Sequence, residues 1–317
     1  MLPVRFHLPG LRYNYPLNMF WVSLLNTHPE FFREGVEIGS VFGTFPYALW
    51  NGGRLLKDDQ CDAAFVKNVI KSWNDKGIPI RYTFTNPLLT EEDLKDPFCN
   101  FCMEAADNGM NEVLTVSPIL EAYLREKYPN FKFDSSTCKE LRNVEQLNAE
   151  MARDYRYVVL DYNMNNHWDL IEQLEPKEKL EVLVNAVCVP DCPRRGEHYR
   201  QIARNQRIIL ENRSLPEGKK KPIEPWHCEY GDHNNIYKIQ KYPTYVSPEA
   251  IWNEYVPRGI HNFKIEGRTA YLFSLIDTYC HYMLKPECAG EARLLLIKNL
   301  ETAGIFSIGR VRPAKWP

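Results

Sequence analysis

Three cysteines are the residues of this chain best suited to chemistry. Cys188 and Cys192 are separated by three residues and follow the apolar run 181–185 (EVLVN), and Cys228 lies further along in the segment PWHCEYG. Thiolates are soft donors, the ligands that zinc and iron–sulfur clusters use in proteins. We therefore expect Cys188, Cys192 and Cys228 to converge on one metal site.

The sequence leaves the fourth ligand of such a site open. Cys138 follows the strand-like run 132–136, and His198 lies at the start of the helical segment after Cys192. Either side chain could complete the site, or neither. Three cysteines and one histidine could equally close a tetrahedral zinc site in a binding or structural protein.

Four polar residues at predicted strand ends are candidates for holding a substrate: Arg81, Asp161, Asn185 and Lys264. In an α/β barrel the carboxyl ends of the strands and the loops after them build the site. Lys264, Glu266 and Arg268 alternate along the last strand, so they share one face. Because buried charges persist only when paired, a structural ion cluster is the alternative to catalysis for these side chains.

The elements that must position these residues follow one rhythm, in which short β-type runs alternate with helical patterns. This alternation predicts a TIM-like (β/α) barrel, with an open doubly wound sheet as second choice. We expect residues 1–35 to form an N-terminal cap, 36–317 a single barrel domain, and 289–303 a last outer helix. The predicted strands are 37–42, 78–84, 112–116, 132–136, 157–161, 181–185 and 260–265, with an eighth placed loosely within 224–245. The predicted helices between them include 90–108 and 118–127.

The composition argues against a membrane protein, an exported protein and a strongly charged nucleic-acid binder. The 317 residues are 44% hydrophobic and carry 39 basic against 41 acidic side chains, so no global field favours nucleic acid or anionic lipid. No stretch of 18 apolar residues is free of charge or proline, and no signal-peptide core is present. We therefore expect a cytoplasmic protein without a membrane partner, whose nine cysteines are reduced.

Three segments of the sequence resemble a known protein family. The segments LDYNMNN, EVLVNAVCVPDCPRRGEHY and GIHNFKIEGR, in that order, resemble the collagenase-like peptidase family. That family includes iron–sulfur barrel proteins of oxygen-independent ubiquinone and RNA hydroxylation. The close match is confined to residues 181–199 and 260–268. The resemblance implies a [4Fe-4S] cluster on four cysteines, of which Cys188 and Cys192 match the paired motif and Cys228 is a further ligand.

The favoured hypothesis is an iron–sulfur enzyme that carries out an oxygen-independent redox or hydroxylation-type modification. Its substrate would be a small molecule or a nucleic-acid base such as one in RNA, and its electron donor a protein. The run Lys219–Lys221 is a weak sign of an RNA partner. The alternatives are a zinc-stabilised binding protein and a collagenase-like peptidase, although no G-x-S-x-G or H-E-x-x-H motif supports hydrolysis.

Overall fold

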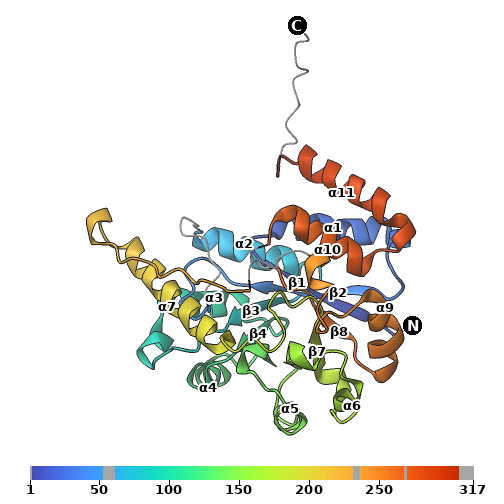
Figure 1. The fold of residues 1–317 in the computed structure, drawn as a ribbon. Coiled ribbons are helices and arrows are strands. Elements are labelled where there is room, and N and C mark those ends of the chain that lie inside the picture. The colour runs from blue at the N-terminus through green and yellow to red at the C-terminus, as the bar shows by residue number, and fades with distance from the viewer. Residues whose placement is uncertain (1, 53–60, 231–235, 268–269, 307–317) are drawn as a thin grey trace.

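A computed structural model describes residues 2–52, 61–230, 236–267 and 270–306. Eight parallel strands form a closed barrel in chain order, and β8 pairs with β1 to close it (Figure 1). The predicted TIM-like α/β barrel is therefore confirmed. The strands are β1 Val4–Pro9, β2 Val36–Gly43, β3 Ile80–Phe84, β4 Glu112–Thr115, β5 Lys132–Ser135, β6 Tyr157–Val159, β7 Leu180–Leu183 and β8 Asn262–Lys264.

Helices follow the strands and pack around the barrel (Figure 1). Helix α7 extends beyond the barrel wall, and α11 packs against α1. The helices are α1 Tyr15–Thr27, α2 Ala63–Asn74, α3 Pro97–Ala106, α4 Pro118–Lys127, α5 Val144–Met151, α6 Trp168–Ile171, α7 Arg195–Arg213, α8 Ile236–Ile239, α9 Pro248–Ala250, α10 Leu272–Met283 and α11 Ala289–Thr302. Two short 3₁₀ turns matter for the site, η3 Thr137–Lys139 and η4 Tyr162–Met164.

One strand was predicted in the wrong place. The eighth strand is β1, within the segment expected to be a cap, and the described part of 224–245 contains the short helix α8 instead. The run VRFHLP was missed because His7 and Pro9 interrupt its apolar pattern. In the structure His7 points into a polar barrel interior, while Phe6 packs outward against Tyr282 of α10.

Capping side chains define the first residue of several helices. The side chain of each capping residue accepts a hydrogen bond from the backbone N–H three positions on, which satisfies a donor at the helix start. Among the described residues, the five such caps are Asp62 of α2, Asp96 of α3, Ser117 of α4, Asn143 of α5 and Ser247 of α9. The loop before each of these helices therefore has a defined end.

Candidate functional site

A pocket of about 260 Å³ lies at the mouth formed by the carboxyl ends of the strands. Phe42 of β2, Thr83 of β3, Leu114 of β4, Leu183 of β7 and Lys264 of β8 all line it. Parallel strands bring their carboxyl ends to one side of a barrel, which is where the sites of such folds are built. The pocket therefore occupies the rim that the sequence predicted.

Four cysteines gather at this pocket. Cys138, Cys188 and Cys228 line it, and the buried Cys192 lies within hydrogen-bonding reach of the Cys188 thiol. Burial raises the pKa of Tyr242, and the nearby side chains of Cys188 and Cys228 raise it further. The structure thus places the three predicted cysteines at one mouth, together with Cys138, one of the two candidates for the fourth ligand.

The loop that carries Cys188 is fastened to the end of β8. The Asn185 side chain donates to the carbonyl oxygen of Glu266 at 3.0 Å and accepts from its backbone N–H at 2.7 Å. The carboxylate of Glu266 accepts from the backbone N–H of Val187 at 3.0 Å. Asn185, predicted to hold substrate, is not among the described residues that line this pocket, and it instead positions the loop before Cys188.

Cys228 is brought to the pocket by contacts with the start of α7. The guanidinium of Arg194 lies 4.2 Å from the ring centroid of Trp226, and His198 stacks on the same ring at 4.5 Å. Arg194 also donates to the carbonyl oxygen of His227 and to the carboxylate of Glu229, at 3.3 and 3.2 Å. The residues on both sides of Cys228 are therefore held, although its own side chain is exposed.

A buried ion pair also lies at the pocket, beside the start of α7. Arg195 donates to the Asp161 carboxylate at 2.7 Å, and both side chains are nearly inaccessible to solvent. Burial alone would lower the pKa of Arg195, but Tyr199 and Asp161 outweigh it and raise the pKa. Arg195 lines the pocket, so Asp161, predicted as a substrate contact, acts there through Arg195.

The same arginine holds the η3 turn. Arg195 donates to the carbonyl oxygen and hydroxyl of Thr137 at 2.7 and 2.9 Å, and the hydroxyl of Ser136 accepts from the backbone N–H of Cys138 at 3.1 Å. The backbone on the amino-terminal side of the Cys138 thiol is thereby fixed. The sequence contained a signal for Arg195, because it directly follows Cys192-Pro-Arg, but its role depends on contacts distant in the chain.

Tyr162 lies beside the thiols with an open hydroxyl. Its side chain lines the pocket and is buried, and the hydroxyl has no hydrogen-bond partner of regular geometry in the described part of the chain. The Cys188 thiol is its neighbour, and burial raises the pKa of Cys188 to about 11 although the contact with Tyr162 lowers it. Without a bound cation, Cys188 is therefore a protonated thiol at neutral pH.

Lys264 is the predicted substrate residue that reaches the pocket directly. Its ammonium lies 3.4 Å from the carboxylate of Glu181 and 4.3 Å from the ring centroid of Phe42. Glu266 also lines the pocket, whereas Arg268 lies outside the described residues. Lys264 therefore brings a positive charge to the pocket, and the carboxylate of Glu181 balances that charge.

Arg81 lies deeper in the barrel and is not among the described residues that line the pocket. Its Nε is 2.7 Å from Glu112 and 2.8 Å from Asp134, and its Nη1 is 2.5 Å from Glu181. All four side chains are fully buried. This structural ion cluster differs from the predicted one of Lys264, Glu266 and Arg268, because only Lys264 of those three is seen to join it, through Glu181.

The donors at the mouth are chemically suited to a soft metal or an iron–sulfur cluster. Within the described residues, no three His, Cys, Asp or Glu side chains already form a ready-made metal-binding group. The thiols of Cys188 and Cys192 are in contact, and the open Tyr162 hydroxyl lies next to them. A bound centre would therefore need Cys138 or Cys228 to turn toward this pair from the pocket wall.

The basic run of residues 219–221 lies on the exposed segment that returns along α7. Lys220 pairs with the carboxylate of Glu217, and Lys221 pairs with Glu211 at 2.5 Å. Two of the three predicted RNA contacts are thus already matched by neighbouring acids. In the described part of the chain, no helix is long and apolar enough to cross a membrane.

A comparison with known proteins found a similar solved structure. No family model matches the chain, and no curated protein matches it. The solved structure titled "The Structure of the U32 Peptidase Mk0906" is similar over 84% of this chain and 94% of that chain, with 13% sequence identity and a TM-score of 0.49. The iron–sulfur cofactor and the predicted site roles stay predictions.

Proposed function

We propose that this chain is an iron–sulfur enzyme whose cluster is bound at the barrel mouth by Cys188, Cys192 and Cys228, with Cys138 as the fourth thiol. It carries out an oxygen-independent redox or hydroxylation-type modification of a small molecule or a nucleic-acid base, with a protein as electron donor. The observation that carries the proposal is the gathering of four cysteines, distant in the sequence, at one pocket.

The choice of Cys138 over His198 as the fourth ligand rests on how each side chain is engaged. His198 is stacked on Trp226 at 4.5 Å with the two rings nearly parallel. Cys138 lies on the pocket wall in a turn fixed by Arg195 and Ser136. A ligand on a turn that is already ordered loses little conformational freedom when it binds.

A bound cluster would supply electron transfer or a Lewis-acid contact to substrate. The protein's own part is to hold the substrate beside it. Lys264 offers a positive charge backed by Glu181, and Arg195 offers a guanidinium oriented by Asp161. The hydroxyl of Tyr162 is a hydrogen-bond donor for a group bound in the pocket, because it has no regular partner among the described residues.

Anaerobic purification followed by iron, sulfide and zinc analysis tests the proposal. We expect brown protein containing iron and sulfide, and Cys188→Ser should lose most of both. Cys288→Ser is the matched control, because Cys288 is also partly buried but lies in the turn before α11 and not at the pocket. This variant should keep the iron content and the visible spectrum of the parent.

Two outcomes would overturn the proposal. Wild-type protein without iron and sulfide, with a spectrum that Cys188→Ser does not change, would remove the cluster. Colourless protein with one zinc per chain, lost in Cys188→Ser, would instead establish a closed structural site of the same thiols. The same preparation therefore separates the enzyme from the zinc-stabilised binding protein.

A further inference from the structure

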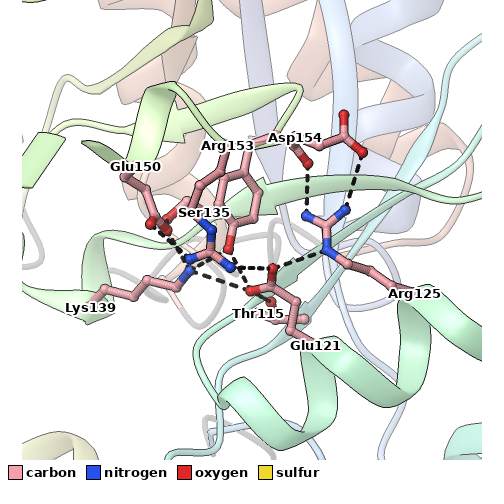
Figure 2. A network of polar contacts seen from close by, with 9 residues as sticks. Thr115, Glu121, Arg125, Ser135, Lys139, Glu150, Arg153 and Asp154 are labelled. Carbon is pink, nitrogen blue, oxygen red and sulfur yellow. Dashed lines mark hydrogen bonds and ion pairs between the residues drawn. The ribbon is translucent and has the colours of Figure 1, made fainter. Parts of the chain in front are cut away.

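An ion network outside the barrel wall joins α4, α5 and the η3 turn (Figure 2). Glu150 accepts from Lys139 at 2.6 Å, from Ser135 at 2.6 Å and from Arg153 at 3.0 Å. Glu121 accepts from Tyr155 at 2.5 Å and from Arg153 at 3.1 Å. Both carboxylates are buried, so each needs these donors to offset the cost of leaving water.

Lys139 is the member of this network that lies in the η3 turn, next to Cys138. Its ammonium contacts both carboxylates, Glu150 at 2.6 Å and Glu121 at 3.5 Å, and donates to the Tyr155 hydroxyl at 2.8 Å. The same ammonium lies 4.6 Å from the Tyr155 ring centroid. These contacts restrain a side chain that loses considerable rotamer freedom when it is fixed.

The η3 turn is held from its other side by the second buried ion pair of the site. Arg195, paired with Asp161, donates twice to Thr137, and the turn ends at Glu140 with a left-handed φ of 56°. A non-glycine residue keeps that conformation only where its surroundings determine it. Cys138 is thus fixed between a network that holds Lys139 and a pair that holds Thr137.

We propose that the network of Glu121, Glu150, Arg153 and Tyr155 positions Cys138 through Lys139. These four residues and Lys139 do not line the pocket in the described part of the chain, so their effect on it must pass through the turn. The inference rests on the proposed function, in which Cys138 is a ligand. Loss of the network should release the thiol while leaving the Cys188 loop, which is fastened to β8, unchanged.

Alkylation of the reduced, metal-free protein tests this role. In Glu150→Gln the amide keeps the shape of the side chain but removes the charge that holds Lys139. Cys138 should then react with iodoacetamide faster, on the order of fivefold for a loss of one strong contact. The tryptic peptide 133–139 (FDSSTCK) reports Cys138 alone, and the peptide containing Cys188 should keep its rate.

Asp154→Asn is the matched control, because Asp154 is a fully exposed member of the same network that pairs with Arg125 and not with Lys139. It should leave the Cys138 rate unchanged, and Lys139→Arg, which keeps the charge, should stay near the parent. Should Glu150→Gln fail to fold, Lys139→Met is tested in the same way, with Cys138 followed on the longer tryptic peptide 133–142. An unchanged Cys138 rate in the charge-removing variant, or equal acceleration at Cys138 and Cys188, overturns the positioning role.

The iron-loaded protein provides a second readout. Glu150→Gln should change the paramagnetic-resonance spectrum of the centre, whereas Asp154→Asn should not, and a purely structural network would leave both spectra alike. Wild-type protein without iron would overturn the proposed function. The alkylation rates would still decide whether the network positions Cys138.

Discussion

The barrel interior around Arg81 and the pocket at the barrel mouth both contain polar groups. The two regions differ in whether these groups have partners within the protein. In the interior, Arg81 contacts Glu112, Asp134 and Glu181, and all are fully buried. At the mouth, thiols face a cavity and the Tyr162 hydroxyl lacks a regular partner among the described residues. A buried charge must stay paired, whereas an open polar group is free to meet a ligand. The comparison assigns stability to the interior and binding to the mouth.

Breaking the interior cluster should have the largest effect. Glu181→Ala leaves the guanidinium of Arg81 and the ammonium of Lys264 without their shared carboxylate, and removal of one partner from a buried ion pair costs about 3–5 kcal/mol. Urea unfolding should show this loss of folding free energy. The control is Glu37→Gln, which removes the exposed pair with Arg5 and should change stability by no more than about 1 kcal/mol. Similar losses in both variants would contradict a special role for the interior.

The pH dependence of stability should carry a contribution from His7. Burial, opposed by Glu181 and aided by Arg81, lowers the pKa of His7 well below 6.5. Below pH 6.5 the unfolded chain therefore binds a proton that the folded chain does not, so stability falls as the pH falls. Between pH 6.5 and 5 this one group can change the free energy of unfolding by at most about 1.4 kcal/mol per pH unit.

Measuring the free energy of unfolding across that range tests the contribution. His7→Gln should make the free energy of unfolding fall less steeply as the pH is lowered. A residual slope should remain, because burial also lowers the pKa of His281. The exposed His28→Gln variant is the control for the loss of a histidine. A slope in His7→Gln equal to that of the parent would show that His7 is protonated equally in the folded and unfolded chain.

The smallest effect should come from the open hydroxyl at the mouth. Tyr162→Phe removes a group that makes no regular hydrogen bond, so we expect a change within about 0.5 kcal/mol in the metal-free protein. Tyr282→Phe is the matched variant, since the buried Tyr282 hydroxyl donates to the carbonyl oxygen of Val184 at 3.0 Å. Its loss should cost about 1–2 kcal/mol in thermal or urea unfolding. Equal costs would remove the distinction between a satisfied and an open hydroxyl.

Local patterns were sufficient to predict most of the barrel. Helix α4 begins at Pro118 as expected, because proline and the preceding Ser117 are start signals that act locally. The predicted helix of residues 90–108 is divided into a 3₁₀ turn and α3, since Pro97 cannot continue a helix that is already under way. Strand β1 was not predicted, because its inward-facing side chains are polar. A strand that contacts a charged interior therefore has the polar composition that is typical of a loop.

The candidate site was predictable only in its chemistry. The spacing of Cys188 and Cys192 indicated a thiol site, and no local pattern could show that Arg194 and Trp226 bring Cys228 to it. Arg81 was expected at the rim because its strand ends there, but its position near the start of β3 places it below the pocket. Long-range contacts, and not residue type, separate the groups of the interior from those of the mouth.

X-ray absorption at the iron edge of anaerobically purified protein tests the central claim most directly, because it counts the atoms around the metal. The proposed site predicts a shell of sulfur neighbours together with the iron–iron distance of a cluster, and a reduced sulfur count in Cys188→Ser. Iron surrounded only by nitrogen and oxygen, or a sulfur shell that Cys188→Ser leaves intact, would contradict it.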